Sequence, residues 1–264
     1  MKTWIPDARN FAYLTWKQVD QLPRSETLLV LPTAAIEQHG HHLPLATDTL
    51  INNLVLGKAL EHIESEVPIY ALPPVCYGKS NEHIGFAGTL SVTAQTFLSV
   101  IRDLGASIAA SGFTKLVLYN THGGNTSLVD VCARDLRAEF GLRTFTLLGS
   151  AGASFPDVNP QERAYGFHAG EIETAFLLHA FPELVHPSEY TANYMARIDD
   201  PDLLKPEGSS ANFAWLTKDI APSGVLGDPT GATAEKGARW VEEAAARVAA
   251  ALLAMYHFKP RHGA

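Results

Sequence analysis

The chain has 264 residues, of which 46% are hydrophobic and 18% charged, so it can bury the core of an ordinary globular protein. A formal net charge of −8, with no segment rich in Lys or Arg, argues against nucleic acid as a partner. The N-terminal residues lack a signal-peptide core, and the longest apolar run, 248–256, is about half the length of a membrane span. We therefore expect a soluble, cytoplasmic protein with no membrane partner.

Strands and helices are predicted to alternate along the chain, because short aliphatic segments alternate with segments of helical apolar spacing. In chain order these are a strand at 27–31, a helix at 48–64, a strand at 68–75, a helix at 93–112, a strand at 115–119, a helix at 128–140, a strand at 143–148, a helix after residue 168 and a long final helix within 231–256. Residues 186–232 are rich in Pro, Gly and Ser and predict irregular surface that allows short strands. The order predicts an α/β fold with a mostly parallel sheet, and the absence of a repeat or linker predicts one domain over 1–264.

A polar cluster follows the first predicted strand, in the stretch AAIEQHGHHLPLATDTL at 34–50. Glu37 and His39 are two residues apart, so on an extended segment both side chains project to the same side, and Asp48 follows at the mouth of the next helix. The two cysteines lack the paired spacing of a zinc–thiolate site, so any metal is expected on histidine and carboxylate, which suit Zn, Mn or Fe(II). Taken alone, the loop also fits a solvated segment, and Asp48 or Thr47 also fits a helix N-cap.

His122 follows the third predicted strand, in the loop NTHGGN at 120–125. Ligands of open parallel sheets gather beyond the carboxyl ends of the strands, so we expect His122 to share one site with the cluster at 34–50. Gly123 and Gly124 also fit a turn that opens a helix, or a loop that exposes N–H groups to an anion. HGG occurs in the oxyanion loop of α/β-hydrolases, but the chain has no G-x-S-x-G motif, which disfavours a serine hydrolase.

A third cluster is FHAGEIETAFLLHA at 167–180. His168 precedes a helix whose first turn carries Glu171 and Glu173, and carboxylates at that place also suit the helix dipole. The i, i+3 spacing pairs His168 with Glu171, but spacing does not decide which glutamate faces a site. Taken alone, the cluster also fits a charged helix start.

Together these strings resemble the creatininase (creatinine amidohydrolase) family. The matching stretches, in order, are IEQHGHHLPLATD at 36–48, NTHGGN at 120–125, HAGEIETA at 168–175 and GDPTGATAEKG at 227–237. The resemblance implies a three-layer α/β/α fold, two divalent metal ions per subunit (Zn, Mn or Fe), and a homo-oligomer, typically a hexamer. It also implies hydrolysis of a non-peptide C–N bond of a small-molecule amide by a hydroxide that bridges the ions.

Residue roles follow from the same resemblance. Glu37, His39, Asp48 and His122 correspond to metal ligands, with Asp48 bridging the two ions, and His168 corresponds to the residue that acts as acid and base, with a pKa near the working range. Creatininase has a further glutamate ligand at the position of Gly124. In relatives whose loop reads HGGN, the glutamate of the HAGxxET motif is expected to replace it, and this glutamate is Glu173 here. The roles of His41, His42 and Glu171 stay open.

The expected substrate is a cyclic amide or a formamide. Creatininase sandwiches the creatinine ring between tryptophans near its catalytic histidine, and this chain has none between Ser150 and His168, which disfavours creatinine itself; Tyr165 or Phe167 is the aromatic candidate for packing on another substrate. Alternatives on the same scaffold are a metallopeptidase, a hydrolase of a cyclic ketone or lactone, and a non-enzymatic oligomeric binding protein.

Overall fold

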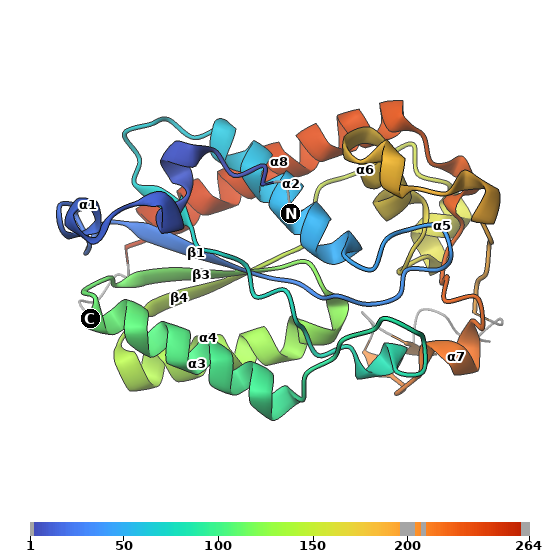
Figure 1. Cartoon of the computed structure of the whole chain (residues 1–264), viewed down its shortest axis with the longest axis horizontal. Helices are drawn as coiled ribbons and strands as arrows, with labels where there is room; N and C mark the ends of the chain where they lie inside the picture. The colour runs from blue at the N-terminus through green and yellow to red at the C-terminus, as the bar shows by residue number, and fades with distance from the viewer. Residues whose placement is uncertain (1–2, 196–203, 207–209, 260–264) are drawn as a thin grey trace.

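A four-stranded parallel sheet lies between two layers of helices (Figure 1). The computed structural model describes residues 3–195, 204–206 and 210–259. The strands run in the order β2-β1-β3-β4, and they are β1 (Leu28–Thr33), β2 (Ile69–Ala71), β3 (Lys115–Asn120) and β4 (Arg143–Leu148). The predicted three-layer α/β/α fold with a parallel central sheet is therefore confirmed.

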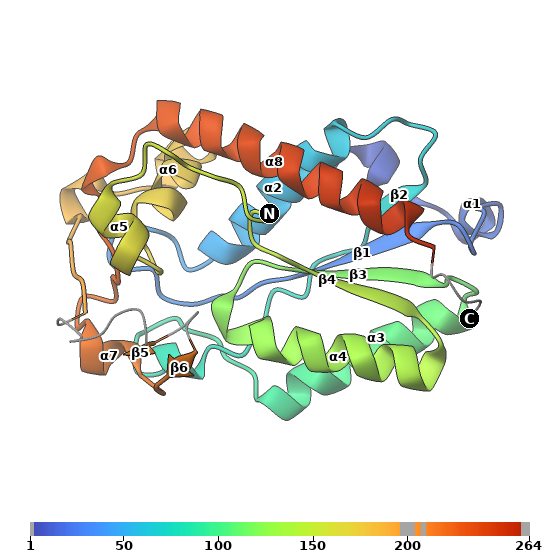
Figure 2. The same cartoon turned by 180° about the vertical axis from the view of Figure 1, so that it is seen from behind.

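The pleat of the central strands divides the apolar core between the two helix layers. In β1, Leu28 and Val30 face one cluster, whereas Leu29 and Leu31 face the other, and all four are buried. Figure 2 shows the two layers from behind. The first layer holds α2 (Thr47–Glu61), α6 (Glu171–Ala180) and α8 (Ala234–His257), and the second holds α3 (Ala94–Ala110) and α4 (Thr126–Phe140). Both faces of the sheet are covered, which explains why its strands read as continuous aliphatic runs.

Several predicted boundaries differ from the structure. The strand predicted at 68–75 ends at Ala71, because Pro73 and Pro74 have no N–H group to donate to a ladder. Helix α2 begins at Thr47 with Ala46 as its N-cap, so neither Thr47 nor Asp48 caps it.

The short helices α1 (Trp16–Asp20), α5 (Pro160–Tyr165) and α7 (Thr217–Ile220) were not predicted, whereas short strands were allowed for within 186–232 and are present as the pair β5 (Leu204–Lys205) and β6 (Ala211–Asn212). The last three fall within the segment predicted to be irregular, 186–232, of which residues 196–203 and 207–209 lie outside the described part of the chain. Among the helices that are described, none has the length and apolarity to cross a membrane.

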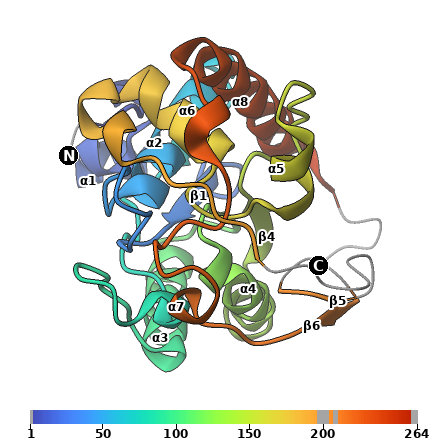
Figure 3. The same ribbon diagram turned by 90° about the vertical axis from the view of Figure 1, so that its right-hand side faces the viewer.

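The parallel direction of the strands brings the loops after β1, β2 and β3 to one end of the molecule. Figure 3 views this end, where α5, α6 and α7 surround the strand ends. Polar loops that are distant in sequence therefore meet here.

Candidate metal centre

All six side chains predicted to form the site lie together at the carboxyl end of the sheet. Glu37 and His39 lie on the loop between β1 and α2, and Asp48 lies in the first turn of α2. His122 follows β3, and the other two lie just before α6 and in its first turn. Five of the six are buried and the last is partly buried, and they are Glu37, His39, Asp48, His122, His168 and Glu173.

The Asp48 carboxylate lies between two histidines that come from different loops. Its Oδ1 atom is 3.4 Å from His39 Nε2, and its Oδ2 atom is 3.2 Å from His122 Nδ1. Burial alone would raise the pKa of Asp48, but His39 and His122 hold it well below its ordinary value. Asp48 is therefore ionised and presents one oxygen to each histidine.

A second carboxylate stands beside each histidine. Glu37 Oε1 lies 3.3 Å from His122 Nδ1, and Glu173 Oε2 lies 4.0 Å from His39 Nε2. Glu173 Oε2 also accepts a hydrogen bond of 2.6 Å from the backbone N–H of Ala169, whose φ of +54° is rare for a residue with a side chain. The cluster thus has a Glu37–His122 side and a His39–Glu173 side, with Asp48 between them.

Several atoms of this cluster are buried without a hydrogen-bond partner. They are Glu37 Oε2, His39 Nε2 and Asp48 Oδ2. A buried polar group without a partner costs about 1–3 kcal/mol, and more when it is charged. Divalent cations bound among them would satisfy these atoms, and imidazole nitrogen with carboxylate oxygen is the donor set of Zn, Mn and Fe(II) sites. The residues present therefore fit a metal centre.

The ring of His168 is fixed by its neighbours. His168 Nε2 lies 2.8 Å from the backbone oxygen of Gln38, so it is the protonated nitrogen, and Nδ1 faces Glu37 Oε1 at 3.9 Å. The ring lies between those of His39 and His83, with centroids 4.3 Å from each. Burial and the charge of His39 lower the pKa of His168 well below its ordinary value, so the imidazole is neutral at pH 7 and not poised near the working range as expected.

Two further polar residues belong to the site although the sequence interpretation missed them. His83 Nε2 lies 3.3 Å from Glu37 Oε1, and Glu82 Oε1 lies 3.6 Å from His122 Nε2. Both come from the loop after β2. The sequence could have indicated them, because the loop after β2 follows a third parallel strand. It must reach the same edge of the sheet as the loops after β1 and β3.

The residues whose roles stayed open lie outside the cluster. His41 is exposed, whereas His42 is buried with its Nε2 atom 3.1 Å from Thr174 Oγ1. Burial lowers the pKa of His42 to about 4, so it is neutral. Glu171 pairs with Lys236 of α8 at 2.5 Å, so Glu173 is the glutamate of this helix that faces the site.

The segment that carries His168 is held by a buried carboxylate on α5. Glu162 Oε1 accepts a 2.9 Å hydrogen bond from the N–H of Glu171, and Oε2 accepts bonds from the N–H of Asp228 and the hydroxyl of Tyr194 at 2.7 and 3.1 Å. A side chain at Gly170 would overlap the same carboxylate. Glu162 therefore fixes the chain on which His168 and the start of α6 stand.

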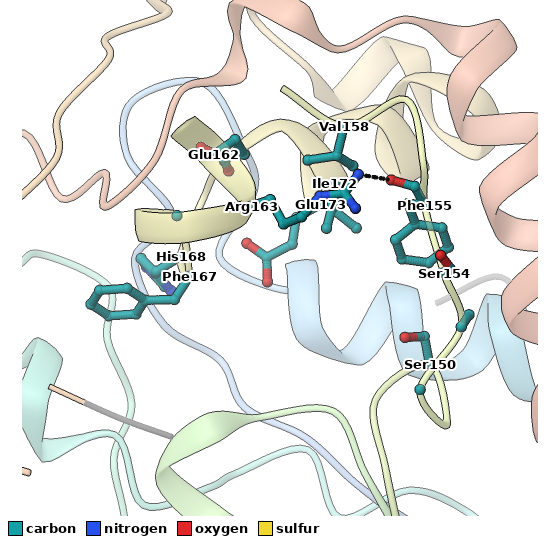
Figure 4. Close-up of a pocket in the computed structure, with 14 residues that line it drawn as sticks. Ser150, Ser154, Phe155, Val158, Glu162, Arg163, Phe167, His168, Ile172 and Glu173 are labelled. Carbon is teal, nitrogen blue, oxygen red and sulfur yellow. Dashed lines mark hydrogen bonds between the residues drawn. The ribbon is translucent and has the colours of Figure 1, made fainter. Parts of the chain in front are cut away.

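Two adjoining cavities give access to the cluster. A small one of about 110 Å³ is lined by the cluster itself with Phe167 and Trp215, and a larger one of about 630 Å³ lies beside it. The two share Phe167, His168 and Glu173. Figure 4 shows the larger cavity, with these three side chains on one side and Ser150, Ser154 and Phe155 on the other.

The fold and the donor set define a metal-binding α/β protein whose site opens at the carboxyl edge of a parallel sheet. The family model for creatininase (creatinine amidohydrolase) matches residues 12–252 of the chain. A mycofactocin precursor peptide peptidase from Mycobacterium ulcerans is 36% identical over 239 residues, covering 87% of each chain. Creatinine amidohydrolase from Pseudomonas putida is 31% identical over 191 residues, or 65% of this chain and 72% of that one.

Solved structures agree with these relatives. A creatininase structure with manganese superimposes with a TM-score of 0.73 at 25% identity, covering 95% of this chain and 99% of the other, and another is of a Zn-Zn type. The chain therefore belongs to the creatininase family. Its members that are named here are hydrolases of C–N bonds, and this chain is a hydrolase of that family.

Metal binding is expected to release protons at neutral pH. Burial lowers the pKa of His39, but Asp48 and the neighbouring glutamates outweigh it and raise that pKa to about 9, so the metal-free protein carries a proton there at pH 7. A ligating imidazole must be neutral, so the metal displaces this proton and its affinity rises as pH increases towards 9. Titration calorimetry with Zn²⁺ at pH 7, in buffers of different ionisation enthalpy, should show release of at least one proton; a heat independent of the buffer would contradict this.

Removal of the Glu162 carboxylate is expected to weaken the segment around His168. In Glu162→Ala the N–H groups of Glu171 and Asp228 lose their acceptor, which costs about 1–3 kcal/mol for each. Urea unfolding should show a lower free energy of unfolding and activity assays a lower kcat. The matched control is Glu183→Ala, which removes an exposed glutamate nearby. Equal stability of the two variants would show that Glu162 does not anchor the segment.

Proposed function

We propose that this protein is a dinuclear metal-dependent amidohydrolase that cleaves a C–N bond at the cluster around Asp48. The observation that carries the proposal is the position of Asp48, whose two oxygens lie 3.4 and 3.2 Å from histidines on opposite sides. A carboxylate in this position would offer one oxygen to each of two ions. Glu37 and His122 would hold one ion, and His39 and Glu173 would hold the other.

In this proposal the chain supplies the metal ligands and a residue that carries a proton, and bound ions would supply the Lewis acid. Zn, Mn or Fe ions bound there would acidify a water molecule and polarise the amide carbonyl. His168 is neutral and directs its unprotonated Nδ1 atom towards the cluster, so this atom can accept a proton from the attacking water. The same atom then delivers the proton to the departing nitrogen. The Gln38 backbone oxygen holds Nε2–H and keeps the ring in this orientation.

The first candidate substrate is a small amide, either cyclic or a formamide. Phe167 and Trp215 form an edge-to-face pair, with centroids 5.4 Å apart, and both line the small cavity over the cluster. An aromatic wall of this kind suits a flat amide. Trp215 lies outside the segment 150–168, so the sequence interpretation did not place it near the site.

A second candidate is a short peptide. The cavity of about 630 Å³ continues from His168 and Glu173 and can hold residues on either side of a peptide bond. The similarity to a mycofactocin precursor peptide peptidase, at 36% identity, supports this class of substrate. The same site serves both candidates, because the ions and His168 act on the carbonyl and nitrogen that all amides share.

Two substitutions are expected to separate metal binding from proton transfer. His168→Ala should keep its metal and lose about 10² to 10⁴ in kcat, the usual contribution of a general acid and base. Asp48→Ala should lose metal as well, because both ions lose a shared ligand. Metal analysis and steady-state kinetics of both variants, with the exposed His41→Ala as the matched histidine control, provide the test. Full metal content in Asp48→Ala would exclude the bridging role.

A substrate screen should distinguish the two candidates. Metal-loaded protein is assayed with creatinine, other cyclic amides, formamides and short peptides, and with the variants Phe167→Ala and Tyr165→Ala. Loss of the Phe167 ring is expected to lower kcat/KM for flat amides by about 2- to 10-fold, the value of one aromatic contact. Tyr165 is exposed and lines neither cavity, so it is the matched control. Turnover of peptides alone would exclude the first candidate.

A further inference from the structure

The loop after β2 presents a carboxylate to the His122 side of the cluster. Glu82 Oε1 lies 3.6 Å from His122 Nε2, and the side chain is only 12% exposed. Glu37, Glu82 and His122 offer ligand atoms that all lie within 4.8 Å of one another. Glu82 also lines the small cavity together with Glu37 and Asp48. The carboxylate is therefore part of the cavity wall that the metal cluster forms.

A glycine in the neighbouring loop makes room for this carboxylate. A Cβ atom at Gly124 would lie 2.2 Å from Glu82 Oε1 and 2.3 Å from the backbone oxygen of Lys79. Real Cβ atoms do not approach other atoms so closely, and a backbone oxygen cannot move aside cheaply. Gly124 thus allows the loop of residues 79–83 to pack against His122, and Glu82 occupies the space that a side chain at position 124 would need.

The carboxylate is oriented by its own ion pair. Glu82 Oε2 pairs with Lys79 Nζ at 3.2 Å, which leaves Oε1 towards His122 and Gly124. The backbone oxygen of Lys79 lies 3.0 Å from His122 Nε2, so it accepts that N–H and directs His122 Nδ1 towards Glu37 and Asp48. The same loop therefore fixes the histidine and holds a free carboxylate oxygen beside it.

Apart from Asp48, the ligand set proposed above has two residues on each side. On one side, the ligand atoms of His39 and Glu173 lie within 4.8 Å of a ring nitrogen of His168. On the other side, those of Glu37 and His122 lie within 4.8 Å of a carboxylate oxygen of Glu82. His83 groups with Glu37 and His168 and not with His122, so it does not take this place. Catalytic zinc sites have three protein ligands and one open position and can expand to about five ligands, and Mn accepts an octahedral set, so the Glu37 side has room for Glu82 beside a water molecule.

We propose that Glu82 is a metal ligand, through Oε1, of the ion held by Glu37, Asp48 and His122. The inference rests on the two-ion function proposed above and adds a fourth protein ligand to one of its ions. It assigns Gly124 the role of leaving space for that ligand. Glu82 comes from a strand–loop unit that carries none of the ligands inferred from the sequence.

The test compares the stepwise binding of Zn²⁺ to the parent protein, Glu82→Ala, Glu82→Gln and Asn81→Ala, by calorimetry and by metal analysis after dialysis. Loss of a residue that only supports a ligand typically costs 10- to 100-fold in metal affinity. Both Glu82 variants should therefore lose more than about 100-fold for one ion and retain the other. Asn81 is an exposed neighbour in the same loop, and its variant should bind both ions as the parent does.

Smaller losses in both Glu82 variants, or equal losses for the two ions, would overturn the ligand assignment and leave the proposed function intact. The number of Zn²⁺ ions that each parent chain binds tests the proposed function separately. Uptake of a single ion would exclude a dinuclear site. Even then, the affinity of Glu82→Gln for that ion shows whether Glu82 binds it. Far-ultraviolet circular dichroism of each variant confirms that a loss of metal is not a loss of fold.

Discussion

The placement of a buried, ionised Asp48 between His39 and His122 is the constraint on which the rest of the site depends. Its carboxylate is removed from water, so the structure around it must supply compensating charge on both sides. The compensation cannot come from one loop. Asp48 must therefore lie within reach of the loops after both β1 and β3, and its position in the first turn of α2 places it there.

Hydrogen bonds between α2 and the strand ends hold Asp48 in this position. The side-chain amide of Asn52, one turn further along α2, donates to the backbone oxygens of Thr33 and Tyr119, each at 3.3 Å. Thr121 Oγ1 donates to the backbone oxygen of Asp48 at 3.1 Å. Since Thr33 lies in β1 and Tyr119 in β3, the start of the helix is fixed against both strands at once.

The two asparagines of NTHGGN join the three loops that meet at the site. Asn120 accepts a hydrogen bond from Thr33 Oγ1 at 3.0 Å, and Asn125 donates to the oxygen of Ala34 while accepting from the N–H of Lys79. The loops after β1, β2 and β3 are therefore tied together by side chains of the third. This explains why the motif has asparagines on both sides of His122, a role that its pattern alone did not reveal.

Sequence reasoning reached the fold and most of the site because both depend on patterns that are local or repeated. Aliphatic runs predict covered parallel strands, and parallel strands bring their loops to one edge, so Glu37, His39, Asp48 and His122 could be grouped without coordinates. Which of Glu171 and Glu173 faces the site depends on the ion pair of Glu171 with Lys236 in α8, a contact between helices that spacing does not show.

The cluster and the cavity walls come from different parts of the fold, which separates the chemistry of this site from its specificity. The proposed ligands stand on loops held by the sheet and by buried hydrogen bonds, and metal-assisted hydrolysis there would act on any carbonyl placed beside them. The cavity walls come instead mainly from the segment 150–167 and from Trp215, neither of which carries a proposed ligand. Changes in these walls alter which amide fits without moving Asp48.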